Sequence, residues 1–319
     1  MLSEVLGFSS GILPACLIAT SASISTYLSR AVELYRLALW IGIRAQIYRA
    51  DAESRIPVYD PRLSSWSVVF LGLTPTLAQE ALDVFVHVQG EHNDKLVITA
   101  VADTSCVTIS GRPDILRGFT EYLKSIHGDS VTAHETSVHT LYHSPTLTTL
   151  RQQVIHDVSR RKIKFPSFED IVLPFRSSFD GVVLKCSTST SATQGSQHSA
   201  SLLHTIVDML VLQPVSWDRV ASSVDQVLPE SADVRILNFG PGGGVASSME
   251  RMLQRSDRIV RVINASMPRD GGKQRMMPKH EPIAIVGMAV NLPGAPNVEK
   301  LWEVMEKGSN TISEVSSHV

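Results

Sequence analysis

Apolar residues recur along the chain at the spacing of helices in some stretches and at the spacing of strands in others, which predicts an α/β protein. Repeats of three and four residues, typical of one helical face, predict several helices. These cover residues 25–50, 76–87, 113–126, 146–159, 202–212, 217–227, 245–253 and 298–307. Short apolar runs between turn residues predict strands at 66–71, 96–101, 106–109, 234–239 and 258–263.

Two of these elements carry a prediction about burial. The helix at 25–50 has an apolar stripe, and we expect this stripe to face the core. Its members are Tyr27, Leu28, Val32, Tyr35, Leu39, Ile43 and Ile47. We expect Tyr35 and Trp40 to be core residues, and the strand at 234–239 to be buried.

The pattern also divides the chain. Residues 64–135 have the order strand, helix, strand, strand, helix, which is typical of a small α+β subdomain with an antiparallel, ferredoxin-like sheet. This subdomain is inserted in a larger domain at 1–264. Glycines, prolines and charges at 265–281 predict a linker, and a buried strand at 282–289 begins a second domain, 282–319. A Ser/Thr/Gln-rich stretch at 187–201 predicts a loop.

Composition excludes several classes of protein. The 319 residues are 43% hydrophobic and carry a net charge of −2, with no basic face for a nucleic acid. Three widely spaced cysteines form neither a disulfide framework nor a zinc pattern, which favours a cytoplasmic location. The apolar run at 12–28 lacks a basic leader and contains Pro14, so we expect neither a signal peptide nor a membrane span.

The chemistry is concentrated near the start, in Gly7-Phe8-Ser9-Ser10-Gly11. This Gly-x-Ser-x-Gly pattern lies between an apolar lead and an apolar helix. It is typical of a nucleophile elbow, in which a sharp turn exposes the serine hydroxyl and flanking glycines let the chain segments pass closely. The N–H of Ser10 would then face a developing oxyanion from a helix N-terminus. The alternative is an ordinary Gly/Ser turn that caps a helix.

Two later segments could complete a site. His143, at the junction between an expected strand and the helix at 146–159, is placed to act as a general base, and His139 competes with it. We expect His134, His156 and His204 to be bystanders. The turn at 240–244 joins a strand to a helix and could hold a phosphate, but it has neither a Walker lysine nor a GxGxxG pattern, which disfavours nucleotide binding.

Together these motifs resemble a known family. The elbow, Val107-Thr108-Ile109-Ser110-Gly111, Leu141-Tyr142-His143-Ser144-Pro145 and Asn238-Phe239-Gly240-Pro241-Gly242 follow the order found in malonyl-CoA:ACP transacylase-like acyltransferases. The chain most resembles the starter-unit ACP transacylase (SAT) domain of fungal non-reducing polyketide synthases. The tail from Glu281, with Leu292-Pro293-Gly294-Ala295 and Leu301-Trp302, resembles the opening of the β-ketoacyl synthase domain that follows SAT.

The resemblance implies an acyltransferase-type α/β fold and assigns roles to residues. Ser9 takes the position of the nucleophile and His143 that of the general base. Ser10 and Gly11 would give backbone support to the oxyanion. A backbone carbonyl near Asn238–Gly240, with Gly240 at its end, would orient the histidine. Leu34 stands where malonyl-specific members have an arginine, which implies an uncharged acyl starter.

The implied reaction is the transfer of a starter acyl group from acyl-CoA or acyl-ACP, through an acyl-serine ester, to the phosphopantetheine thiol of an acyl carrier protein. The implied partners are that carrier protein, the adjacent β-ketoacyl synthase domain and an acyl-CoA or fatty acid synthase donor. No bound cofactor, metal, nucleic acid or membrane is implied.

One departure and two alternatives accompany this prediction. Family members have a further segment before the nucleophile, with a loop that supplies a second oxyanion donor; its loss typically costs about 10²–10³ in rate, so we expect a truncated chain with weak activity alone. An esterase or thioesterase could use the same pair, although the α/β-hydrolase histidine comes later in the chain. A degenerate domain with a docking role is the other alternative.

Overall fold

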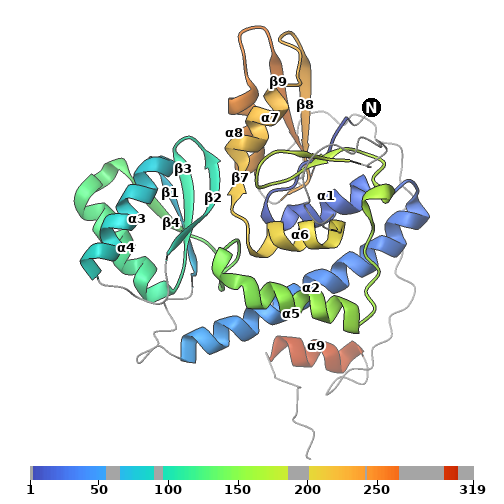
Figure 1. The fold of residues 1–319 in the computed structure, drawn as a ribbon, viewed down its shortest axis with the longest axis horizontal. Coiled ribbons are helices and arrows are strands. Elements are labelled where there is room, and N and C mark those ends of the chain that lie inside the picture. Colours follow the sequence, from blue (N-terminus) through green and yellow to red (C-terminus); the bar gives the residue numbers. More distant parts are fainter. Residues whose placement is uncertain are drawn as a thin grey trace, which may run out of the picture. The chain divides into compact units, whose positions relative to one another are not determined.

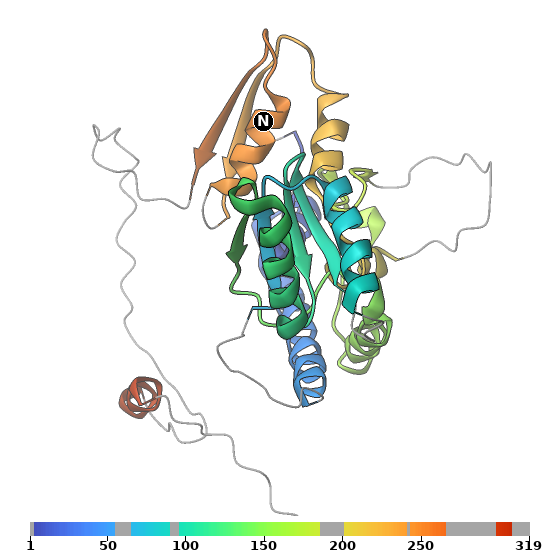
Figure 2. The same cartoon turned by 90° about the vertical axis from the view of Figure 1, so that its left-hand side faces the viewer.

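The computed structural model describes residues 3–54, 65–89, 96–185, 201–240, 243–265 and 298–307. The chain divides into two compact units, residues 1–267 and 268–319. Within the second unit the described part is one helix, α9 (Val298–Glu306). All other elements belong to the first unit, which is drawn from two directions in Figures 1 and 2.

Helices form the larger core of the first unit (Figure 1). They are α1 (Ile12–Ala19), α2 (Ile24–Ser54), α5 (Thr148–Arg160) and α6 (Leu202–Val211). A short antiparallel pair, β5 (Phe175–Arg176) and β6 (Val183–Leu184), packs at one end through the fully buried Phe175. These elements join segments distant in sequence, so α1 and α6 pack together although about two thirds of unit 1 separates them.

The predicted burial of the α2 stripe was wrong. Tyr35 is 72% exposed and Leu28 is 60% exposed, and Val32, Leu39 and Ile47 also lie outside the core. The helix has a second apolar face, and that face is the buried one; it consists of Leu34, Leu37, Ile41, Ala45 and Ala52. This face packs against α1 and α5.

The small α+β subdomain was predicted correctly. Its strands β1 (Ser67–Leu71), β2 (Val97–Asp103), β3 (Cys106–Ser110) and β4 (Thr132–Glu135) form an antiparallel sheet in the order β4-β1-β3-β2. Two helices, α3 (Pro75–Gln89) and α4 (Pro113–His127), cover one face (Figure 2). Phe70 of β1 and Phe85 of α3 both pack edge to face on Phe119 of α4, so the subdomain has its own core. The pattern had not predicted β4.

The last part of the unit is a strand–helix–strand layer. Strands β8 (Asp233–Asn238) and β9 (Ile259–Asn264) are parallel and joined through α8 (Gly244–Leu253), beside α7 (Trp217–Asp225). β8 is not a buried strand, because its residues alternate between exposed and half-buried and Phe239 is 71% exposed. Only one face of this two-stranded sheet packs on helices, so burial follows the period of two of a strand.

A further short strand links this layer to the subdomain. β7 (Val215–Ser216) extends the subdomain sheet by pairing in parallel with β2, directly before α7. The predicted loop at 187–201 and linker at 265–281, apart from residues 201 and 265, lie outside the described residues, as does the predicted strand at 282–289. In the part of the chain that is described, no helix has the length and apolar character needed to cross a membrane.

Candidate active site

The elbow at Ser9 depends on close backbone approach at one of its two glycines. A Cβ on Gly7 would lie 2.5 Å from both the Gly11 oxygen and the Ile12 Cα, so no larger residue fits without movement. Gly11 has φ −61° and open space where a Cβ would be. The expectation that both glycines permit close passage therefore holds for Gly7 and fails for Gly11.

Ser9 itself has a strained backbone. Its φ is 52°, in the left-handed region that non-glycine residues rarely adopt. A turn of 3₁₀ helix, η1 (Ser9–Gly11), leads directly into α1, so Ser10 lies at the N-terminal end of a helical segment, where the first N–H groups have no intrahelical acceptor. The Gly11 N–H donates to the Phe8 oxygen at 2.9 Å and so closes the turn. That bond leaves Ser10 as the candidate oxyanion donor.

His143 meets Ser9 across 134 positions of sequence. Its Nε2 lies 2.7 Å from Ser9 Oγ. The imidazole is buried, with the residue only 7% exposed, and its backbone φ of 56° is also left-handed. The strand predicted before His143 is absent, because residues 137–143 have no regular structure. A short 3₁₀ turn, η3 (Pro145–Leu147), follows His143.

Two backbone carbonyls orient the imidazole. His143 Nδ1 lies 2.9 Å from the Met209 oxygen and 3.0 Å from the Gln213 oxygen. A carbonyl can only accept a hydrogen bond, so the proton belongs on Nδ1 and Nε2 is left to accept from the Ser9 hydroxyl. The imidazole of His143 is thus in the tautomer that it needs to take the proton from the Ser9 hydroxyl.

The prediction that the orienting carbonyl lies near Asn238–Gly240 was wrong. The Gly240 N–H instead donates to Asn238 Oδ1 at 3.1 Å. The carbonyls come from the end of α6, where the Gln213 N–H donates to the Asp208 oxygen and leaves the Met209 oxygen for His143. The signal was present in the sequence, because Pro214 disfavours a helical residue before it and so ends α6 there.

Burial controls the charge of the histidine. Desolvation lowers the pKa of His143 below its ordinary value of 6.5, and the hydrogen bonds that Nδ1 donates to the Gln213 and Met209 oxygens oppose this less strongly. The neutral form therefore predominates at neutral pH, which is the form that can accept a proton.

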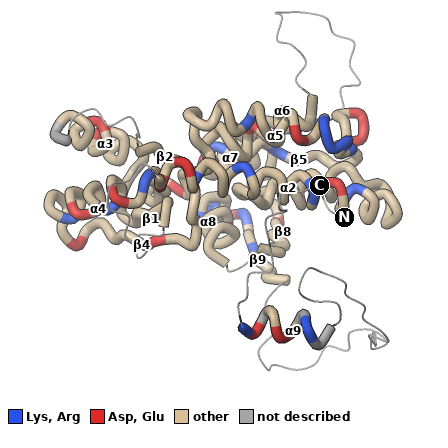
Figure 3. Tube along the Cα trace, turned by 90° about the horizontal axis from the view of Figure 1, so that it is seen from below, with Lys and Arg blue, Asp and Glu red and all other residues tan. Residues whose placement is uncertain are grey.

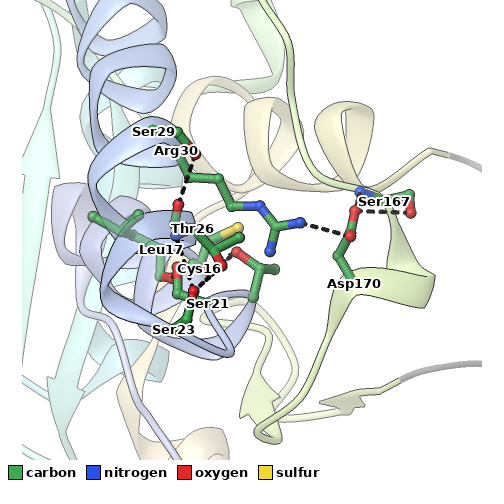
Figure 4. A network of polar contacts seen from close by, with 10 residues as sticks. Cys16, Leu17, Ser21, Ser23, Thr26, Ser29, Arg30, Ser167 and Asp170 are labelled. Atoms are coloured by element: carbon green, nitrogen blue, oxygen red, sulfur yellow. Dashed lines mark hydrogen bonds and ion pairs between the residues drawn. The ribbon is translucent and has the colours of Figure 1, made fainter.

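The other candidate residues do not join the pair. His134, His139 and His156 are exposed, and His204 is half-buried on α6. Cys16 is fully buried in α1, and burial raises the pKa of its thiol to about 12; the nearby Arg30 lowers it less. Figure 4 shows Cys16 beside this arginine, whose Nη2 binds Asp170 Oδ1 at 2.6 Å and so ties α2 to the turn η4 (Phe168–Asp170).

The sequence pattern did not predict an ion pair between α2 and α5. Arg44 donates to the buried Asp157 of α5 through Nε at 2.5 Å and Nη2 at 2.9 Å. The sequence shows that Arg44 and Asp157 are charged residues of two predicted helices. It does not show that they meet, because their contact depends on how α2 packs on α5.

Charged residues of both signs are distributed over the first unit. Lys and Arg are interspersed with Asp and Glu along its elements (Figure 3). Among the described residues, no group of three or more His, Cys, Asp or Glu side chains is arranged to hold a metal ion.

Solved structures identify the fold. FabD from Acinetobacter baumannii is 15% identical with a TM-score of 0.55, over 82% of this chain and 68% of that one. The malonyl-transacylase in a complex titled PlMCAT:AntF has a TM-score of 0.56 at 15% identity, over 83% and 70% of the two chains. The fold is therefore that of the malonyl-CoA:ACP transacylase class of acyltransferases.

Sequence comparisons identify the domains. Residues 2–143 match the family model described as "Starter unit:ACP transacylase in aflatoxin biosynthesis" (SAT), and residues 280–319 match "Beta-ketoacyl synthase, N-terminal domain". Residues 2–143 thus match the SAT family and residues 280–319 match the N-terminal domain of ketosynthases, in the order that the resemblance implied.

Named relatives extend along nearly the whole chain. Orsellinic acid synthase ArmB of Armillaria ostoyae is 42% identical over 98% of this chain, and an orsellinic acid synthase of Beauveria bassiana is 30% identical over 97%. The chain spans about 14% of the length of each of these relatives.

Proposed function

We propose that the SAT domain transfers a starter acyl group from an acyl-CoA or acyl-ACP thioester to the phosphopantetheine thiol of an acyl carrier protein, with Ser9 as nucleophile and His143 as general base. The observation that carries this proposal is the 2.7 Å contact between Ser9 Oγ and His143 Nε2, with both carbonyl acceptors on Nδ1. A serine hydroxyl is not ionised at neutral pH and needs such a base.

In the first half-reaction, His143 Nε2 takes the Ser9 proton as Oγ attacks the thioester carbonyl. The C–O bond forms, the oxyanion faces the Ser10 N–H, and collapse breaks the C–S bond. His143 returns the proton to the departing thiolate. The product is an acyl-Ser9 ester and a free thiol.

In the second half-reaction, the phosphopantetheine thiol of the carrier protein gives its proton to His143. Its sulfur attacks the ester carbonyl, a new C–S bond forms and the C–O bond to Ser9 breaks. His143 then returns the proton to Ser9 Oγ. The Met209 and Gln213 carbonyls stabilise the imidazolium that exists between these proton transfers.

The starter group is proposed to be an uncharged acyl chain. Leu34 is 4% exposed and belongs to the apolar core around α1 and α6, where a substrate carboxylate would find no compensating cation at that position. The partners are proposed to be the carrier protein and the ketosynthase domain of the same polyketide synthase. The ketosynthase match at residues 280–319 and the transacylase–carrier complex among the structural neighbours support this.

The test is to incubate the protein with radiolabelled acyl-CoA and follow label on the chain, then on added carrier protein or in water as free acid. We expect label on Ser9 that moves to the carrier thiol. Ser9→Ala should abolish the labelling, and label that survives this change would refute the assignment. Release mainly to water would favour the esterase alternative.

A further inference from the structure

A buried arginine outside the Ser9–His143 pair is attached to the chain that leads into the elbow. Arg176, in β5, is 3% exposed. Its Nε donates to both carboxylate oxygens of Glu4, at 3.2 and 3.0 Å. A guanidinium is rarely buried this far unless it is fully paired, so its partners indicate what it holds in place.

The second side of the guanidinium reaches a different part of the fold. Arg176 Nη1 donates to the Gly181 oxygen at 3.1 Å and to Ser223 Oγ at 2.6 Å. Ser223 also donates to the Gly181 oxygen, at 2.8 Å. Ser223 belongs to α7, so one arginine links the N-terminal segment, the β5–β6 turn and α7.

The same segment is attached to β5 through its backbone. The Val5 N–H donates to the Pro174 oxygen at 3.0 Å, and Val5 forms a parallel bridge with Phe175. Farther along, the Phe8 ring packs edge to face on Trp217 of α7, with ring centres 5.5 Å apart. The residues before Ser9 are thus held by the two elements that Arg176 links.

This attachment matters because Ser9 has a strained φ of 52°. A residue in that region is strained and keeps its conformation only when its surroundings impose it. Ile12 and Cys16 are both fully buried, which fixes the chain after the elbow. The ion pair between Arg176 and Glu4 holds the chain on the other side, before the elbow.

We propose that Arg176 and Glu4 are positioning residues that hold the elbow, and with it Ser9 Oγ, within reach of His143. This inference rests on the proposed function, in which Ser9 is the nucleophile. It assigns a catalytic consequence to an ion pair that touches neither the serine nor the histidine.

The test compares Glu4→Gln, Arg176→Gln and Arg176→Lys with Arg258→Gln. Arg258 is a matched control because it is also 3% exposed and paired, with Asp225 and the Leu228 and Pro229 carbonyls. Two quantities are measured on the 319-residue chain: the rate of acyl-Ser9 formation per folded molecule and the amide hydrogen exchange of residues 5–12. Glu4→Gln keeps the side-chain shape, so it remains informative should Arg176→Gln fail to fold.

We expect the Glu4 and Arg176 variants to slow acylation about 10- to 100-fold at unchanged KM and to speed exchange in the elbow, with Arg176→Lys the mildest at that position. Arg258→Gln should lower thermal stability without either effect. If Glu4→Gln and Arg176→Gln leave the elbow's exchange and acylation at wild-type values, the proposal is overturned. Faster elbow exchange in a protein whose wild type forms no acyl-serine would support the anchor and reject the proposed function.

Discussion

At the scale of single residues, the site is defined by backbone strain shared between two distant positions. Among the described residues, three that are not glycine have positive φ: Ser9, His143 and Lys162. Lys162 follows α5, where a left-handed residue commonly ends a helix. The other two face each other at 2.7 Å. Ser9 and His143 thus both have a strained backbone and share one hydrogen bond. Such strain is typical of active sites, where it holds the reacting groups in position.

The two elbow glycines should respond differently to a methyl group. Gly7→Ala places a Cβ 2.5 Å from backbone atoms of Gly11 and Ile12, which cannot move without disturbing α1. We expect this variant to lose acyl-Ser9 formation and to unfold more readily, by about 1–3 kcal/mol as for other overpacked sites. Gly11→Ala is the control, because its Cβ meets open space. Equal thermal stability of the two variants in a melting experiment would contradict the steric account of the elbow.

The buried imidazole predicts where activity is lost in acid. Burial lowers the pKa of His143 below 6.5, so the neutral base should persist under mildly acidic conditions and be lost only as pH falls through the lowered value. We expect the acid limb of kcat/KM for acyl-Ser9 formation below pH 6.5.

The same shift has a consequence for stability. The unfolded chain binds a proton near pH 6.5 while the folded chain does not, so the free energy of unfolding should decrease as pH falls from 6.5 towards the folded pKa. His143→Gln should lose this part of the pH dependence. An acid limb above pH 6.5 would show that the histidine is stabilised in its charged form.

At the scale of elements, α2 shows how charge and apolar surface are arranged on a long helix. Its charged residues between Ile24 and Ile47 all contact their own chain: Arg30 binds Asp170, Glu33 binds Arg36, Arg36 also binds the Arg161 oxygen, and Arg44 binds Asp157. The apolar residues on the side of α2 that faces away from the core, among them Leu28, Tyr35 and Leu39, are exposed. Pairing with fixed partners, as well as burial of apolar area, therefore sets the rotation of this helix about its axis.

The Arg44–Asp157 pair predicts a stability difference between buried and exposed ion pairs. The Asp157 side chain is 2% exposed and accepts two bonds from Arg44, which lowers the pKa of its carboxyl. We expect Asp157→Asn to reduce the free energy of unfolding at pH 7 by about 2 kcal/mol, in the range of hydrogen bonds to charged groups. The loss should shrink as pH falls below the ordinary value of 3.8, where the unfolded chain's carboxyl is protonated.

Glu121→Gln provides the comparison for this prediction. Glu121 pairs with Arg117 on the exposed face of α4, with side chains 72% and 58% exposed. Such pairs contribute about 0–1 kcal/mol. Chemical denaturation of both variants at pH 7 measures the difference, and equal losses would mean that burial adds nothing to the Arg44–Asp157 pair.

Much of this arrangement could be predicted from sequence, and the failures have physical causes. The periods of apolar residues located the helices and the ferredoxin-like subdomain, because local spacing alone determines them. Spacing cannot choose between two apolar faces of one helix, so the burial of Tyr35 was predicted wrongly. The carbonyls that orient His143 belong to the end of α6, and only tertiary packing brings that end to the imidazole.

At the scale of the whole molecule, the described residues of unit 1 form three separate apolar clusters: around α1, α2, α5 and α6, within the subdomain, and between α7, α8 and β9. The site draws on more than one of them. Ser9 begins the turn into the first cluster, while Phe8 directly before it packs on the third. Loosening the contact between Phe8 and Trp217 should therefore disturb Ser9 without any change in the residues around His143.

The position of the site within unit 1 predicts that unit 2 is dispensable for acylation. Ser9, His143, Met209 and Gln213 all precede Met267, as do the three apolar clusters. A chain ending at Met267 should form acyl-Ser9 at a rate within about twofold of the 319-residue chain and show the same main thermal transition, as expected of a unit with its own core. His143→Ala in the shortened chain controls for labelling that does not depend on the pair. A large loss of both the transition and the labelling would instead mean that residues 268–319 contribute to folding of the acyltransferase unit, because none of the residues proposed to take part in the chemistry lies beyond Gln213.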